Sequence, residues 1–172
     1  MGAQGMVATG HPLASSAALD VLKEGGNAFD AALCASGVLA VVKSYHCGLG
    51  GDVFGIFYSA KERRVSVLNG SGRSPRRIRR DMFAEKIPHQ GMLAASTPGT
   101  VDAWLEAAAR LGTRSIGDLL KPAIAYAREG FPVFPHLASV IKASRETLGT
   151  DPAWAEIFLP QGKIPEVGDL LI

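Results

Sequence analysis

Cysteine is scarce in this sequence, with only Cys34 and Cys47 among 172 residues. Two cysteines cannot form the framework of bridges that stabilises small secreted domains, which excludes a disulfide-rich fold. Cys34 falls within an apolar helical stretch, so we expect it to be buried as a small hydrophobic residue.

Long hydrophobic runs and an excess of charge of one sign are also missing. The 18 lysines and arginines are nearly balanced by 16 acidic residues, giving a formal net charge of +2. This balance gives no reason to expect nucleic acid or an anionic membrane as a partner. The most apolar stretch, residues 28–42, is too short for a transmembrane helix and contains Asp30 and Ser36.

No targeting segment is visible at the start of the chain. Residues 1–4 (MGAQ) lack the basic region and apolar run of a signal peptide. Gly2 does not begin a myristoylation signal, because Met6 stands where serine or threonine is required. We therefore expect a soluble chain, cytoplasmic as given, or periplasmic or secreted if a leader has been removed.

Neither a metal site nor a cofactor loop is predicted. His46 adjoins Cys47, while His89 and His136 are isolated, and no spacing matches a zinc site. The glycines of residues 48–51 (GLGG) follow a predicted helix and precede a predicted strand, the reverse of a dinucleotide-binding loop. They indicate tight turns instead. His11, which precedes a proline, is expected to cap or pack against a helix.

The residues that are present predict helices at the start of the chain. Gly25 and Gly26 are suited to end a first helix over residues 12–23. Asn27 is a good N-cap for a second helix over residues 28–42, and Asp30 favours its positive end. The second helix is apolar almost all round, so we expect it to be buried.

Strand signals follow, and then a helical half. Residues 53–59 and 64–68 predict an antiparallel hairpin that turns at residues 61–63, and residues 5–9 predict a further strand. Two strands alone are marginal, so strands from elsewhere should pair with them. Residues 69–80 predict a loop with five arginines. The expected helices cover residues 79–85, 98–111, 115–129 and 136–148, with a short one starting at Pro152.

Two of these helices have a predicted core-facing side. In the helix over residues 98–111 the apolar positions at helical spacing are Val101, Trp104, Leu105 and Ala108. In the helix over residues 115–129 they are Ile116, Leu119, Leu120, Ile124 and Ala127. No repeat or linker divides the chain, and we predict a single domain over residues 1–172 that is incomplete at its end.

Five segments resemble the start of the gamma-glutamyltransferase family and occur in the family's order. They are residues 5–9 (GMVAT), 22–28 (LKEGGNA), 47–52 (CGLGGD), 80–83 (RDMF) and 96–101 (STPGTV). The resemblance covers essentially the whole chain. It implies an α+β fold, the four-layer αββα sandwich of N-terminal-nucleophile hydrolases, of which this chain supplies the N-terminal part of the large subunit.

The resemblance also implies the chemistry. In such enzymes a precursor cleaves itself, and the threonine exposed at the start of the small subunit becomes the nucleophile. Its freed α-amine acts as the general base. The threonines of this chain are all internal, so no catalytic residue is assigned and the chain alone is expected to be inactive. The implied partners are the small subunit, or the remainder of the precursor, and a small-molecule amide substrate.

One position departs from the family pattern. Transpeptidases of the family carry an arginine four residues before a proline, and its guanidinium grips the α-carboxylate of the γ-glutamyl substrate. Alignment on Pro75 places Ser71 there, and the nearest arginine, Arg73, is displaced by two residues. Ser71 and Arg73 are therefore the predicted substrate-binding residues. Arg76, Arg77, Arg79 and Arg80 are expected to form a surface cluster.

Three functions remain open on the sequence. One is cleavage of small γ-glutamyl compounds such as glutathione by a hydrolase or transferase. Another is an amidase or acylase of the same fold, with no need of a γ-glutamyl group. The third is a non-catalytic remnant that binds a ligand or partner.

Overall fold

The computed structural model describes residues 2–83, 85–88 and 91–172, which form a mixed helix and strand structure. Its helices are α1 (Pro12–Lys23), α2 (Ala28–Val42), α3 (Thr100–Leu111), α4 (Ile116–Glu129), α5 (Pro135–Leu148) and α6 (Pro152–Phe158). Its strands are β1 (Val53–Ser59), β2 (Arg64–Gly70), β3 (Phe131–Pro132) and β4 (Leu170–Leu171). Short 3₁₀ turns cover Arg80–Met82, Met92–Ala94 and Pro160–Gly162.

The central element is α2, and both of its ends are where the sequence predicts them. Gly25 has φ of 87° and ends the first helix, as expected of a residue without a side chain. The Asn27 side chain accepts from the N–H groups of Phe29 and Asp30, while the Asp30 carboxylate accepts from the N–H of Asn27. This reciprocal cap fixes the start of α2.

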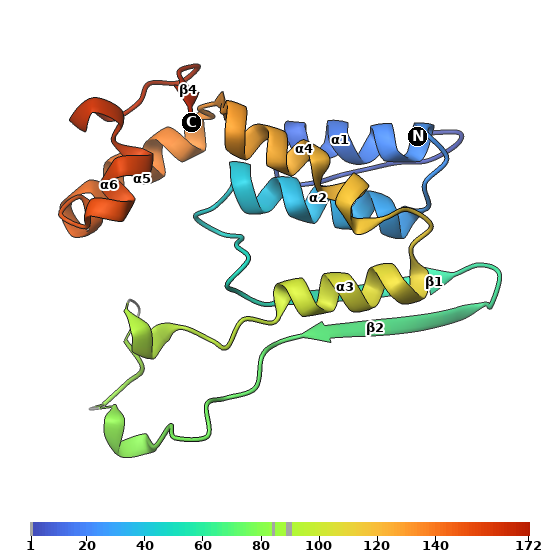
Figure 1. The fold of residues 1–172 in the computed structure, drawn as a ribbon, viewed down its shortest axis with the longest axis horizontal. Coiled ribbons are helices and arrows are strands. Elements are labelled where there is room, and N and C mark those ends of the chain that lie inside the picture. Colours follow the sequence, from blue (N-terminus) through green and yellow to red (C-terminus); the bar gives the residue numbers. More distant parts are fainter. Residues whose placement is uncertain (1, 84, 89–90) are drawn as a thin grey trace.

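Helix α2 packs against both α1 and α4 in a helical layer (Figure 1). Its buried apolar residues belong to the main core or to a smaller cluster with Trp104 and Leu119. The prediction of a buried second helix is confirmed, since Val38 and Cys34 are fully buried. Among the described residues no helix is long and apolar enough to cross a membrane.

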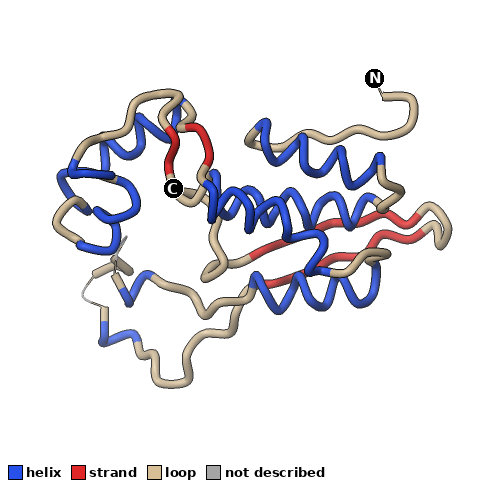
Figure 2. Tube along the Cα trace, turned by 45° about the horizontal axis from the view of Figure 1, so that its top comes forward, coloured by secondary structure: helices blue, strands red, loops and turns tan. Residues whose placement is uncertain are grey.

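The predicted hairpin is also confirmed. β1 and β2 pair antiparallel, with Val53 opposite Gly70 and Ser59 opposite Arg64. α2 and α3 cover one face of it (Figures 1 and 2). The other face is apolar and exposed, and its side chains are Phe54, Ile56, Tyr58, Val65 and Val67. Within the described residues, no third strand joins this pair.

Three details of the prediction are wrong. Residues 5–9 form no strand, because none of the described strands pairs with them and Val7 packs instead against the helical core. β2 continues to Gly70, so Asn69 and Gly70 belong to the strand rather than to the loop. The helix predicted from residue 98 begins at Thr100, with Gly99 as its N-cap.

The buried side of α3 also differs from the prediction. Val101 and Leu105 are 43% and 51% exposed, whereas Ala103, Trp104 and Ala107 are buried. The reason is the close approach of α3 to the hairpin, where a side chain on Gly70 would meet the Ala103 methyl group at 2.6 Å. Only the side of α3 that carries small residues fits against the hairpin at this distance. Trp104 is the one large side chain on that side.

Helix α4 shows a smaller deviation of the same kind. Leu119 is buried as predicted, but Ile124 is 48% exposed and Ala127 is also exposed, while Ala123 takes the core position. Beyond α4, Gly130 has φ of 88° and leads into β3, which pairs with β4. β4 is the last element of the described chain.

Candidate functional site

The two predicted substrate-binding residues directly follow β2, in a segment with no regular secondary structure. Ser71 and Arg73 are both exposed. The backbone N–H of Ser71 donates to the Asn69 side-chain oxygen at 3.1 Å, which stabilises the exit from the strand. The segment then turns toward the N-terminus of α3.

Glycines bring this segment against the loop before α3. A side chain on Gly72 would lie 1.7 Å from the Thr97 carbonyl oxygen, and one on Gly99 would lie 2.3 Å from the Gly70 carbonyl oxygen. No side chain fits at either distance. The absence of a Cβ at these positions therefore lets residues 70–73 and 97–99 pack backbone to backbone.

The loop before β1 joins the same junction. The Gly51 carbonyl oxygen accepts from the N–H groups of Gly99 and Thr100, at 3.0 and 3.1 Å. The Ser96 hydroxyl donates to the Asp52 carboxylate at 3.2 Å. Three segments far apart in the sequence, residues 48–52, 70–73 and 96–100, thus meet at the end of the hairpin.

A cleft of about 450 Å³ opens beside this junction. Ser71 and Arg73 line one side of it, and Asp102 and Glu106 from α3 line another. Glu106 is paired with Arg110 of its own helix, and no ion pair among the described residues includes Arg73. The Arg73 guanidinium therefore remains able to bind a carboxylate from outside the chain.

Sequence reasoning did not single out Asp102 and Glu106 as cleft residues. Their spacing of four predicts a shared face of α3, but the sequence does not show that this face adjoins the segment after β2. The predicted surface cluster is confirmed, since Arg76, Arg77, Arg79 and Arg80 are all exposed. Arg79 pairs with Asp81 at 3.1 Å.

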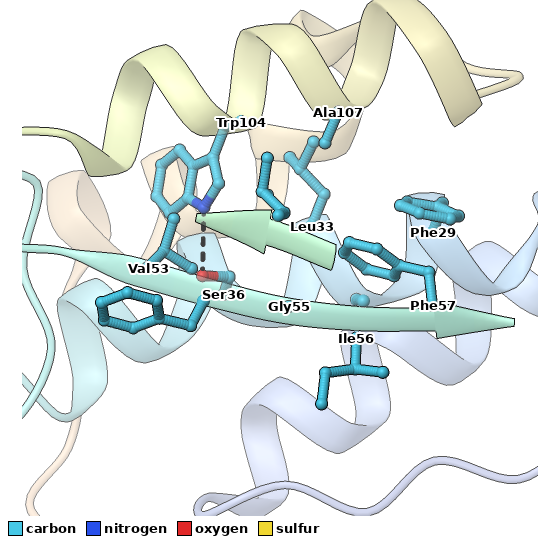
Figure 3. A pocket seen from close by; sticks show the side chains of 12 residues that line it. Phe29, Leu33, Ser36, Val53, Gly55, Ile56, Phe57, Trp104 and Ala107 are labelled. Atoms are coloured by element: carbon cyan, nitrogen blue, oxygen red, sulfur yellow. Dashed lines mark hydrogen bonds between the residues drawn. The ribbon is translucent and has the colours of Figure 1, made fainter. Parts of the chain in front are cut away.

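A second, apolar cavity of about 320 Å³ lies between the hairpin and the helices α2 and α3 (Figure 3). The Trp104 indole N–H donates to the Ser36 hydroxyl at 3.2 Å across one end of it. The rings of Phe29 and Phe57 pack with centroids 4.0 Å apart at the other end. Its lining holds no ionisable side chain, and the hydroxyl of Ser36 is engaged by the Trp104 indole with no base beside it, so the cavity is a packing feature rather than a catalytic one.

The nucleophilic and metal-binding groups of the described chain form no catalytic constellation. Burial, together with the charges of Asp20 and Glu24, raises the pKa of the Cys34 thiol to about 11, so that it stays protonated and unreactive. Within residues 2–83, 85–88 and 91–172, no three histidine, cysteine or acidic residues are grouped as metal ligands. His89 lies outside the described residues.

The structure shows what His11 and His136 contact. His11 is confirmed as a cap, since its Nδ1 accepts from the backbone N–H of Leu13 at 3.2 Å. His136 is isolated in the sequence, but in the structure its ring is parallel to that of His46, with centroids 6.4 Å apart. The sequence gave no sign of this contact, since it joins the turn after α2 to the start of α5, 90 residues further along the chain.

The chain is similar to known proteins in both structure and sequence. The structure is similar to the crystal structure of Helicobacter pylori γ-glutamyltranspeptidase, with a TM-score of 0.91 and 29% identity, over 100% of this chain and 51% of that chain. The fold is thus that of the N-terminal-nucleophile hydrolases, as predicted, and the chain covers its N-terminal portion. A family model for gamma-glutamyltranspeptidase matches residues 14–172. The chain belongs to the gamma-glutamyltranspeptidase family.

Two curated relatives show the range of this family. The chain is 41% identical over 175 residues to a glutathione hydrolase-like YwrD proenzyme of Bacillus subtilis, covering 100% of this chain and 33% of the relative. It is 35% identical over 184 residues to an acylase ACY 1 proenzyme of Pseudomonas sp. (strain V22), covering 99% and 33%. The chain spans about a third of the length of these relatives.

Proposed function

We propose that residues 1–172 are the N-terminal portion of the large subunit of a γ-glutamyltransferase-like enzyme. The complete enzyme hydrolyses or transfers the acyl group of small γ-glutamyl amides such as glutathione. Membership of the family, and relatives named as glutathione hydrolase-like and γ-glutamyltranspeptidase, support this proposal. The nucleophilic threonine and its α-amine belong to the small subunit made from the same precursor, so this chain alone is inactive.

In this proposal the Arg73 guanidinium binds the α-carboxylate of the substrate, and the Ser71 hydroxyl donates a hydrogen bond to the same carboxylate. The observation that carries the assignment is the cleft at the end of β2, where Arg73 is exposed and the glycine-based junction fixes the backbone of its loop. A guanidinium binds a carboxylate through two parallel N–H···O bonds, which sets its orientation as well as its affinity.

An acylase or amidase is the second candidate, and a specific observation favours it. Ser71 occupies the position of the family's carboxylate-binding arginine, and a relative of similar identity is named as an acylase. If Arg73 does not bind the substrate, the described lining of the cleft offers no other positively charged side chain for an α-carboxylate. Acyl groups that lack an α-carboxylate then become the expected substrates.

Substitution of Arg73 in the full precursor separates the two candidates. We expect R73A to raise KM for a γ-glutamyl anilide about 10- to 150-fold, since a hydrogen-bonded charge pair contributes about 1.5–3 kcal/mol. R73K should raise KM less, because lysine keeps the charge and loses only the two parallel hydrogen bonds of the guanidinium. KM for a matched anilide without the α-carboxylate should not change. R76A, an exposed arginine of the neighbouring cluster, is the control.

The outcomes are distinct. Equal KM values for R73A and the unsubstituted enzyme on both anilides would remove Arg73 from the site and favour the acylase.

The intact mass of the purified natural protein tests the third function, that of a non-catalytic remnant. A second, smaller chain that begins with threonine supports the enzyme, and a single unprocessed species without amide-cleaving activity would overturn it in favour of a non-catalytic remnant.

A further inference from the structure

The segment between β2 and α3 projects from the rest of the molecule (Figures 1 and 2). Its described residues contain no regular structure other than the 3₁₀ turns Arg80–Met82 and Met92–Ala94. In compact domains, connections longer than about 12–15 residues without secondary structure are uncommon and are often functional. We call the described residues 73–83 and 91–97 of this segment the arm.

Both ends of the arm are fixed at the candidate cleft. The backbone of Gly72 lies directly against the Thr97 carbonyl group, and Arg73 and Thr97 both line the cleft. The hydrogen bond from Ser96 to Asp52 also holds the second end. The arm therefore leaves and rejoins the molecule at the place where the proposed enzyme binds its substrate.

Between these ends, the arm has no packing partner in the described part of the chain. Residues 74–82 and 91–95 are all exposed, and neither apolar core includes any of them. Their hydrogen bonds, and the ion pair of Arg79 with Asp81, join residues no more than three positions apart. Nothing in the described chain therefore covers the side chains of the arm.

The exposed side chains of the arm are of the kinds found at protein–protein contacts. Ile78, Met82, Met92 and Leu93 are between 41% and 89% exposed. Residues 73–83 also contain five arginines and no lysine. Methionine and arginine are enriched in protein–protein interfaces, whereas lysine is depleted, and exposed apolar groups rimmed by polar ones mark interaction sites.

The position of the arm indicates which partner covers it. In the proposed enzyme, the threonine of the small subunit must reach the cleft. Ile78 is five residues from Arg73 and Leu93 is four residues from Thr97, so each Cα lies within about 18 Å of its end of the cleft. This chain spans about a third of its relatives, so the remainder is large enough to cover both halves of the arm.

We propose that the arm is a docking surface for the small subunit of the mature enzyme. Ile78, Met82, Met92 and Leu93 are buried against that subunit, and the two halves of the arm contact it on either side of the cleft. The proposal rests on the proposed function, because it takes the nucleophilic threonine to be on the small subunit.

Limited proteolysis of the mature enzyme tests the docking. Trypsin cleaves after arginine, and residues 76–80 offer four arginines in a segment that is exposed in this chain. M92D/L93D adds two charges that oppose docking. We expect trypsin to cleave at residues 76–80 at least about tenfold more slowly in the unsubstituted enzyme than in this variant.

I124D is the matched control, because Ile124 is 48% exposed but belongs to α4, apart from the arm in both views (Figures 1 and 2). Cleavage at residues 76–80 should be as slow in I124D as in the unsubstituted enzyme. Equal cleavage rates in M92D/L93D and the unsubstituted enzyme would overturn the proposal.

A photo-cross-linker identifies the partner without relying on a destabilising charge. p-Benzoylphenylalanine in place of Met92 should link the large subunit to the small subunit of the mature enzyme, and the same group in place of Ile124 should not. The mass of the linked species distinguishes the outcomes. No link from position 92, a link between two large subunits, or an equal yield from position 124 would overturn the proposal.

The same experiments separate this proposal from the proposed function. A processed enzyme that cleaves the γ-glutamyl anilide, but gives no link from position 92 to its small subunit, would overturn the docking alone. A single unprocessed species would overturn both, because no small subunit would then exist.

Discussion

The buried carboxylate of Asp30 accepts a hydrogen bond of 2.9 Å from the backbone N–H of Thr113, 83 residues further along the chain. It also accepts from the Thr113 hydroxyl and from the N–H groups of Asn27 and Arg114. The Asn27 side chain in turn donates to the Leu111 carbonyl oxygen at 2.7 Å. The cap of α2 is therefore also the anchor of the turn between α3 and α4.

Removing the Asp30 carboxylate should destabilise the precursor more than any surface substitution. D30A leaves three backbone N–H groups and the Thr113 hydroxyl without their acceptor, which should cost about 2–4 kcal/mol of unfolding free energy. T113V removes only one of these donors and should cost about 1 kcal/mol. Denaturant unfolding of both variants measures the difference. Equal values would mean that the Thr113 hydroxyl carries the whole interaction.

Asp30 should also make stability depend on pH. Burial alone would raise the pKa of its carboxyl, but the hydrogen bonds from Thr113, Asn27 and Arg114 outweigh burial and lower it below 3.8. The unfolded state therefore takes up the proton first. The stabilisation is fully present above the unfolded pKa and is lost as pH falls through the lower, folded pKa.

D30N isolates this contribution because asparagine does not titrate. The difference in unfolding free energy between the unsubstituted precursor and D30N should be constant near neutral pH and shrink as pH falls below the unfolded pKa of about 4. Unfolding curves at a series of pH values provide the test. A difference that grows with acid would contradict a lowered pKa.

Gly72 should be required for the shape of the candidate site. G72A brings a methyl group onto the Thr97 carbonyl oxygen, so the segment after β2 must move away from the loop before α3. Overpacking of this kind costs about 1–3 kcal/mol. We expect a lower melting temperature and, if Arg73 binds the substrate, a higher KM for γ-glutamyl substrates.

Gly50 offers the matched control for Gly72. No atom lies within 4 Å of a side chain placed there, and its φ is not in the left-handed region. G50A should therefore change neither stability nor KM measurably. A loss in G50A as large as that in G72A would show that general loop stiffening, rather than the close approach, is responsible.

The Trp104–Ser36 hydrogen bond should couple α3 to α2. Trp104 is 4% exposed, and its indole N–H is the donor to the Ser36 hydroxyl. In a double-mutant cycle of W104F and S36A, the coupling energy should be about 1 kcal/mol. Additive effects of the two substitutions on the unfolding free energy would mean that this hydrogen bond makes no net contribution to stability.

Local signals predicted much of the fold because they act within a few residues. Gly25 and Asn27 set the ends of α1 and α2 through backbone freedom and side-chain capping, and Ser115 and Asp151 cap α4 and α6 in the same way. Only part of the lining of the candidate cleft could be predicted. Arg73 and Ser71 came from the resemblance, whereas Asp102 and Glu106 entered the cleft only in the structure.

The sequence by itself determined the helices, the hairpin and the family, since capping, periodicity and ordered motifs are properties of neighbouring residues. Tertiary structure alone decided which side of α3 is buried, because two apolar sides were available and only the one with small residues fits against Gly70. It alone also decided which distant residues meet. Gly72 with Thr97, Asp30 with Thr113 and His46 with His136 are brought together by the packing of whole elements, which no local pattern specifies.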